Sequence, residues 1–196
     1  MSGSFKNKGG VMKEVLLLMI CVGLIVAGVW AEEETAAPRM AFFTKTTELA
    51  KVAFIERQGP FDAIPKVMEE LEKWFLENDY TMAGPPIGVY FDDPAQVSPD
   101  SLRWEIEIAI AEDVEEKAPA GGVAIKTVQP MLVAVTYHKG AYEEVGNAYG
   151  MLFAWLGKNG YQVVGAPREI YWRDPETTPT EELLSELQIP VRSMKK

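Results

Sequence analysis

Two short stretches of this sequence carry the residues whose types could do chemistry. In PREIYWRDP, Glu169 and Tyr171 alternate on a predicted strand, so their side chains share one face. In IGVYFDDP, Gly88 and Tyr90 hold the same two places. A carboxylate beside aromatic rings suits a cationic, partly apolar ligand. It also suits general acid–base chemistry if burial raises its pKa. From spacing alone, a second interpretation is equally open: Glu169 is an ordinary exposed strand residue, and Gly88 lies at a bulge or turn.

The two stretches belong to a repeat that covers most of the chain. Shifted by 81 positions, residues 42–110 overlay residues 123–191 without a gap, and 17 of the 69 pairs are identical. The identical pairs include glycines, prolines and aromatic residues that end strands, mark helices and form turns. A match of this kind indicates a tandem duplication.

Each copy predicts a β-α-β-β unit. An extended stretch (VAFIER or LVAVTYH) ends at a glycine, a helix-spaced apolar stripe follows, an asparagine stops it, and a D-P turn separates two further strands. The stripe places Trp74 and Trp155 in the core. The sequence therefore predicts an α+β fold with pseudo-twofold symmetry and a central ligand cleft on the side away from the helices. Ile170 and Trp172 are expected to pack on the helix, which would turn Glu169 towards that cleft.

Divergence between the copies gives the candidate ligand-binding residues. The glutamate supplies one charge, and the glycine opposite leaves space for a ligand. The predicted ligand-binding set is Glu169, Tyr171, Tyr90, Gly88, Glu105 and Tyr137. His138, the only histidine, is expected to be structural, and one histidine cannot build a histidine-rich metal site. We therefore expect no metal and no cofactor.

The first 31 residues predict a signal peptide or an N-terminal membrane anchor. Three lysines precede an unbroken apolar run at 15–31, with Ala31 at the expected cleavage point. Met1 and Met12 are both compatible starts. The only cysteine, Cys21, lies in this run, so cleavage would leave no thiol for disulfides, catalysis or metal binding. The remaining predicted boundaries are a spacer at 32–41, a linker at 111–122 and a tail at 192–196.

The charge of the chain argues against one class of partner. Beyond Ala31 there are 16 basic and 28 acidic side chains, a net charge of −12. Phosphate backbones repel such a surface, so we expect no nucleic-acid partner. Contact with a membrane is expected only through the N-terminal segment, and the protein is expected to be exported, periplasmic or extracellular.

The motifs GPFDAI, GAYEEV, IGVYFDDP and PREIYWRDP, the last followed by TPTEELLSELQIPV, resemble the GyrI-like small-molecule-binding family. These are effector-binding domains of AraC-type and multidrug-binding bacterial regulators. The resemblance covers roughly 42–191. It implies a duplicated β-α-β-β fold with Glu169 in a cleft that contacts cationic lipophilic ligands. It does not carry over the regulator role, because the sequence lacks a DNA-binding segment and predicts export.

Three functions follow as expectations. The first is non-enzymatic binding of a small amphipathic or cationic molecule outside the cytoplasmic membrane. The second is hydrolysis of a small reactive molecule with Glu169 as general acid or base, as the resemblance implies for some stand-alone members. The third is haem or tetrapyrrole binding with His138 as ligand, since the family's fold is similar to that of SOUL-type haem-binding proteins. The sequence does not decide between a binding protein and a hydrolase.

Overall fold

The structure is a computed structural model that describes residues 40–120 and 122–195. The predicted signal peptide or anchor therefore lies outside the described residues, as does most of the predicted spacer. Among the residues described, no helix is long and apolar enough to cross a membrane.

The described chain folds into strands and two long helices, which confirms the predicted α+β class. The helices are α2 (Ile64–Glu77) and α3 (Gly146–Asn159), each entered through a short 3-10 turn, η1 (Phe61–Ala63) or η3 (Tyr142–Glu144). The strands are β1 (Phe43–Thr46), β2 (Ala50–Gln58), β3 (Ile87–Tyr90), β4 (Arg103–Ile110), β5 (Lys117–Ala120), β6 (Val123–Val128), β7 (Leu132–Lys139), β8 (Tyr161–Val163), β9 (Arg168–Tyr171) and β10 (Leu184–Ser193).

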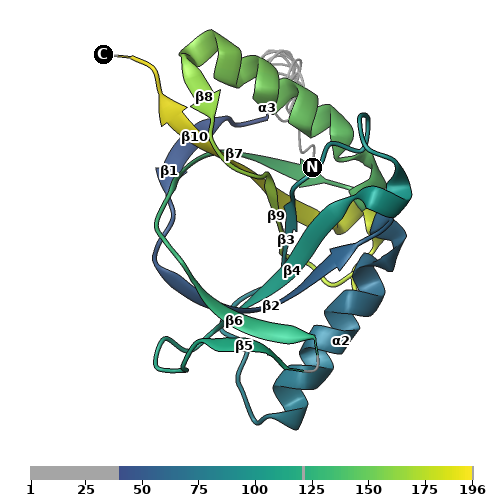
Figure 1. The fold of residues 1–196 in the computed structure, drawn as a ribbon. Coiled ribbons are helices and arrows are strands. Elements are labelled where there is room, and N and C mark those ends of the chain that lie inside the picture. Colours follow the sequence, from purple (N-terminus) through teal and green to yellow (C-terminus); the bar gives the residue numbers. More distant parts are fainter. Residues whose placement is uncertain (1–39, 121, 196) are drawn as a thin grey trace, which may run out of the picture. The chain divides into compact units, whose positions relative to one another are not determined.

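One antiparallel sheet connects the two halves. Its strand order is β1-β7-β10-β9-β3-β4-β2-β6-β5, with β8 paired to β10. The halves meet where β3 pairs with β9, and Gly88 lies directly opposite Glu169 in that pair. Figure 1 shows the sheet strongly curled, with α2 and α3 both on its outside. The face under the helices is called the outer face below, and the opposite face is called the inner face.

The 81-residue shift relates most elements of the two halves. It maps β1, β2, α2, β3 and β4 onto β6, β7, α3, β9 and β10. Each half has more strands than the predicted β-α-β-β unit: β1 and β6 precede the first expected strand, and the second half also has the short strand β8. Strands β1 and β6 are exchanged: β1 pairs with β7 of the second half, and β6 pairs with β2 of the first. The short strand β5 falls inside the predicted linker at 111–122.

The ends of the helices follow the duplicated sequence closely. Asn78 donates a side-chain hydrogen bond to the carbonyl of Trp74 at 2.8 Å, and Asn159 does the same to Trp155 at 2.8 Å. Both tryptophans are only partly buried, and they stack on tyrosines at the edge of the core rather than filling its centre. The centre of each helix contact is a fully buried leucine, Leu71 or Leu152.

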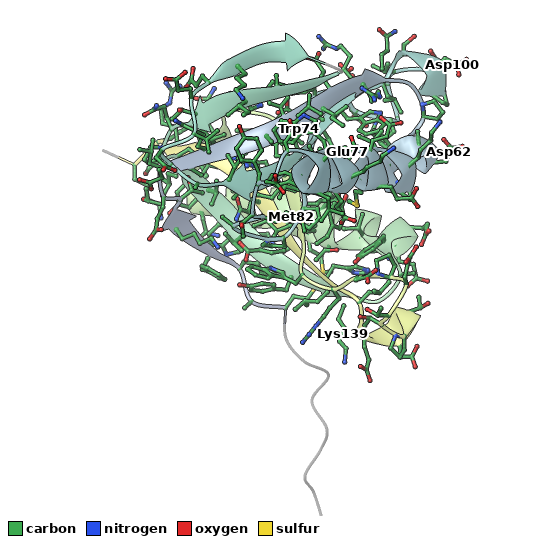
Figure 2. All side chains as sticks on the ribbon, turned by 90° about the horizontal axis from the view of Figure 1, so that it is seen from below. Asp62, Trp74, Glu77, Met82, Asp100 and Lys139 are labelled. Carbon is green, nitrogen blue, oxygen red and sulfur yellow. The ribbon has the colours of Figure 1, made fainter. Side chains whose placement is uncertain are left out.

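The two faces of the sheet differ in composition. Apolar residues of β4 and β10, such as Trp104, Ile106 and Leu187, pack under the helices on the outer face. The inner face carries buried carboxylates instead, among them Glu105 and Glu107. The remaining charged side chains lie mostly outside the body, and Figure 2 shows exposed Asp62, Asp100 and Lys139 at the periphery of the view. The candidates for a functional site are therefore the buried polar side chains of the sheet, and not the exposed charged side chains.

Candidate functional site

Glu169 lies at the centre of the sheet, on its outer face. Its strand partners are Gly88 on β3 and Leu187 on β10, and Leu187 packs with α3 in the core of the second half. The predicted position on the side away from the helices is therefore wrong. The residues expected to pack on the helix point the other way: Ile170 alternates onto the inner face, and Trp172 is 46% exposed. The expectation failed because the inner face of this curled sheet is itself buried.

A chain of hydroxyl groups ends on the Glu169 carboxylate. Tyr171 donates to Oε2 of Glu169 at 3.0 Å, and the hydroxyl groups of Tyr90 and Tyr171 are hydrogen-bonded to each other. Since Tyr171 gives its proton to the carboxylate, Tyr90 is the donor in the second bond. Burial raises the pKa of both tyrosines, so both remain protonated donors. The structure thus brings three of the predicted site residues into direct contact.

Gly88 permits this arrangement by having no side chain. A Cβ atom at this position would lie 2.5 Å from the hydroxyl oxygen of Tyr90 and 3.0 Å from that of Tyr171. The predicted role of Gly88 was to leave space for a ligand. In this structure the space next to Gly88 is filled by the two tyrosine hydroxyl groups.

Aromatic residues from both helix entries hold the tyrosines in place. The ring of Phe61 meets that of Tyr90 edge-on at 5.1 Å, and Tyr142 meets Tyr171 in the same way at 5.1 Å. Edge-to-face pairs of this kind stabilise by roughly 0.5–1.5 kcal/mol beyond their buried area. The site is therefore walled by four aromatic rings, related in pairs by the duplication.

A fifth ring, Tyr149 on α3, approaches Glu169 from the helix side. Its hydroxyl oxygen is buried without a hydrogen-bond partner among the described residues. It nevertheless lies close enough to Glu169 to help lower the pKa of that carboxyl. The hydroxyl group of Tyr149 is thus a near neighbour of Glu169 that falls short of hydrogen-bond geometry, and it is available to a ligand.

The electrostatics of Glu169 are dominated by burial. Desolvation raises the pKa of Glu169 above its ordinary value, and this effect outweighs the opposing effects of Tyr171, Tyr149 and the charge of His138. The side chain is only 7% exposed. No lysine or arginine in the described part of the chain forms an ion pair with it. It is a buried carboxylate whose neighbours are mostly hydroxyl groups and rings.

The other two predicted ligand-binding residues lie on the opposite face. Glu105 is buried on the inner face and pairs with Lys126 at 2.6 Å. Tyr137 lies opposite Glu186 on the same face and is 40% exposed. The structure thus separates Glu105 and Tyr137 from Glu169 by the thickness of the sheet. They alternate with outer-face residues along their strands, which the sequence alone could not assign to a face.

His138 lies on the outer face, at the end of β7. Its Nε2 atom is 2.8 Å from the carbonyl oxygen of Ala141, which only an N–H can satisfy. That nitrogen is therefore engaged with the backbone, as expected for a structural histidine, and nothing in this geometry favours a haem ligand.

Three residues of this site were not among the sequence candidates: Phe61, Tyr142 and Tyr149. All three fall on the helix-spaced apolar stripes of the two copies, for which the sequence predicts packing. The repeat held a usable signal for the third, because Tyr149 stands where the first half has Met68. A change from an apolar to a hydroxyl-bearing side chain on a buried stripe marks a position with more than a packing role.

An open surface hollow of about 370 Å³ lies elsewhere, at one end of the second half. Its lining includes Lys139, Arg173 and Glu182, all exposed, and does not include Glu169. Burial and chemistry both favour the carboxylate–tyrosine cluster as the functional site.

Comparison with known proteins agrees with this architecture. A DNA gyrase inhibitor from Serratia proteamaculans is 30% identical over 133 residues, which are 64% of this chain and 83% of that protein. The crystal structure of the EcmrR C-terminal domain matches with a TM-score of 0.70 at 20% identity, covering 80% of this chain and 99% of that one. A hydrolase from Listeria innocua matches with a TM-score of 0.60 at 15% identity, covering 80% and 94%.

At such identities the two structures establish the fold alone. The sequence profile of the GyrI-like small molecule binding domain matches residues 40–192, which is nearly the whole described chain. The chain therefore belongs to the GyrI-like small-molecule-binding family.

Proposed function

We propose that this domain binds a small cationic or amphipathic molecule through Glu169, between the two helices on the outer face of the sheet. Small-molecule binding is the property of the family, and the charge preference is our inference from the site. The observation that carries it is the buried carboxylate, with which no lysine or arginine of residues 40–120 and 122–195 forms an ion pair. An ionised carboxylate in such a place is costly unless a positive partner arrives, and a cationic ligand would be that partner.

The aromatic walls support the same proposal. Tyr90, Tyr171, Tyr142 and Phe61 surround the carboxylate with ring faces and edges. Such rings contribute roughly 0.5–2 kcal/mol per cation–π contact and also bury the apolar part of a ligand.

The test uses two probes of equal shape: N,N,N-trimethyl-4-phenylbutylammonium and its neutral isostere, in which carbon replaces nitrogen. Isothermal titration calorimetry of the parent protein should show a clear preference for the cation. Glu169→Gln should weaken cation binding by about 1.5–3 kcal/mol, the scale of the Coulomb attraction between two partly buried charges, and leave the neutral probe unchanged. Equal affinity of the parent for both probes would refute the charge preference.

One observation also favours the hydrolase alternative. Burial raises the pKa of Glu169, and Tyr171 is held against it as a second proton donor. A protonated Glu169 could give its proton to the epoxide oxygen as the ring C–O bond breaks and water adds to the ring carbon; the proton that this water then loses would return to the Glu169 carboxylate and leave a diol. Styrene oxide tests this: parent protein should hydrolyse it at least a hundredfold faster than Glu169→Gln protein does. Equal rates would leave binding as the function.

Export remains a proposal that rests on the apolar run at 15–31 and the residues around Ala31. Mass spectrometry of the protein from its host should give an N-terminus near Glu32 if the segment is cleaved. An intact cytoplasmic chain that begins at Met1 or Met12 would refute export.

A further inference from the structure

The second half differs from the first at two neighbouring outer-face positions beside the site. Where the first half has Trp104 and Arg57, the second has Ser185 and His138. Trp104 is buried, and its indole N–H donates to the carbonyl of Gly59 at 2.9 Å, at the turn that leads into α2. Ser185 is completely buried but much smaller.

His138 performs the anchoring role of that indole in the second half. Its ring N–H donates to the carbonyl of Ala141, in the turn that leads into α3. Because Nε2 holds the proton in this bond, Nδ1 of the neutral ring is an acceptor. The turn before the helix is thus held by an apolar indole in the first half and by a polar imidazole ring in the second.

Ser185 lies between His138 and Tyr171, the residue that contacts Glu169. In the sheet register it lies between His138 on β7 and Tyr171 on β9, and Tyr171 is bonded to Glu169. His138 is also close enough to Glu169 to influence the pKa of its carboxyl. The four side chains therefore form one continuous polar strip across the outer face of the second half.

This strip contains polar atoms without partners. Three buried side-chain polar atoms in the described residues lack a hydrogen-bond partner, and two of them, the hydroxyl oxygens of Ser185 and Tyr149, lie on this side of the molecule. A buried hydroxyl left unpaired costs about 1–3 kcal/mol. Glu169 uses Oε2 for Tyr171, which leaves Oε1 for another donor. A ligand with hydrogen-bond donors would satisfy these atoms.

We propose that Ser185 and His138 make the site selective for a protonated primary or secondary amine over a quaternary ammonium. The inference rests on the proposed cation binding at Glu169 and names the class of cation. The N–H groups of an alkylammonium can donate to Oε1 of Glu169, the Ser185 hydroxyl and Nδ1 of His138. A trimethylammonium group carries the same charge but would press methyl groups against these atoms and leave them unpaired.

The experiment compares 4-phenylbutylamine with its N,N,N-trimethyl derivative by calorimetry at pH 8. The parent protein should bind the primary amine about tenfold or more tightly. Ser185→Ala should reduce that preference to about threefold or less by weakening the amine alone. His138→Trp, whose indole N–H can donate to the Ala141 carbonyl as that of Trp104 does to the carbonyl of Gly59 but which has no ring acceptor, should act in the same direction. Ser101→Ala, at an exposed serine outside the site, is the matched control and should change neither affinity.

The outcomes separate this inference from the function on which it rests. If both probes bind equally well and Glu169→Gln weakens both, cation binding stands and amine selectivity is overturned. If Ser185→Ala weakens both probes to the same degree, the serine acts through packing and the inference is likewise overturned. If the parent binds neither probe, the proposed function and this inference fail together.

Discussion

The two faces of strand β9 place neighbouring residues in opposite electrostatic situations. Arg168 points to the inner face and pairs with Glu107 at 2.5 Å, while Lys126 lies 2.9 Å from the same carboxylate. Glu169 points to the outer face, where the hydroxyl group of Tyr171 donates a hydrogen bond to it. Both carboxylates are buried, at 2% exposed for Glu107 and 7% for Glu169. The difference between them is the cation.

The duplication explains how this difference arose. Glu105–Lys126 on the inner face has a symmetry mate in Glu186–Lys45, at 2.6 and 2.5 Å, and each pair joins the two halves across an exchanged strand. Balanced charges are thus an inherited structural feature of the inner face. On the outer face the copies differ: the second has Glu169 where the first has Gly88, and no lysine or arginine of the described residues pairs with Glu169. Under the proposed function, it is this unpaired carboxylate that selects the ligand.

The largest effect should come from breaking the inner-face pair. Arg168→Ile leaves Glu107 with Lys126 as its only cation, and removal of one partner from a buried pair costs about 3–5 kcal/mol of unfolding free energy. We expect a loss of about 3 kcal/mol in urea denaturation. The control is the double variant Arg168→Ile with Glu107→Gln, which copies Ile87 and Gln188 of the other half and should recover most of the loss. A single variant within 1 kcal/mol of the parent would contradict the structural role.

Gly88→Ala should have the next largest effect. The new Cβ atom must displace Tyr90 or Tyr171, whose rings are fixed by Phe61 and Tyr142. Overpacking of this kind costs about 1–3 kcal/mol, and cation binding should weaken at least tenfold. Gly84→Ala is the matched control, because its Cβ would meet only Ala109 at an ordinary 3.7 Å. Equal effects of the two substitutions would show that the close approach at Gly88 is unimportant.

Glu169→Gln should stabilise the protein, the opposite sign to the inner-face variant. Burial raises the pKa of Glu169 in the fold, so the folded protein holds this proton more tightly than the unfolded chain does. The parent therefore loses stability as pH rises through the folded pKa, and the variant does not. We expect the variant to be about 1–2 kcal/mol more stable at pH 8 and the gap to close towards pH 4. Glu181→Gln, at an exposed position, should show no such gap. A variant less stable than the parent at pH 8 would mean that Glu169 is paired after all.

The smallest expected effect is a difference between Tyr171→Phe and Tyr90→Phe in how far each changes the pKa of Glu169. Tyr171→Phe removes the hydroxyl that donates to Glu169, so the pKa of Glu169 should rise further. Tyr90→Phe removes only a donor to Tyr171 and should change that pKa far less. Each should alter stability by about 0.5–1.5 kcal/mol, the net scale of one hydrogen bond. A carbon-13 NMR titration of the Glu169 carboxyl distinguishes them, and equal titration curves would contradict the order of the hydroxyl chain.

The fold was largely predictable because the duplication supplied two independent readings of one pattern. The same signals occur in both copies: the glycines at 59 and 140, the asparagines at 78 and 159, and the D-P turns. Each copy therefore supported the assignment of strands, helix and turns in the other. The exchanged strands β1 and β6 were missed because no D-P turn or terminal glycine marks them, unlike the equally short strands β3 and β9, which precede D-P turns. Strand exchange is also a tertiary property that no local pattern encodes.

Only part of the candidate site was predictable from the sequence: Glu105 and Tyr137 lie on the other face, and the aromatic residues Phe61, Tyr142 and Tyr149 were not among the predicted residues. Glu169, Gly88, Tyr90 and Tyr171 were identified as one group from alternation and divergence, and the structure brings them together. Alternation divides a strand into two faces without saying which is under the helices. The usual assumption, that the polar face is solvated, fails for this sheet because its curled inner face buries Glu107, Arg168 and Glu186 as ion pairs.

The most direct test of the central claim compares two buried carboxylates on opposite faces, Glu169 and Glu105. The affinity of a lipophilic ammonium probe is measured by calorimetry for Glu169→Gln and Glu105→Gln protein, each confirmed as folded by circular dichroism. If an unpaired carboxylate selects the ligand, the first substitution weakens binding about tenfold or more and the second changes it less than about twofold. Equal losses, or a larger loss at Glu105, would contradict the assignment of the ligand site to the outer face.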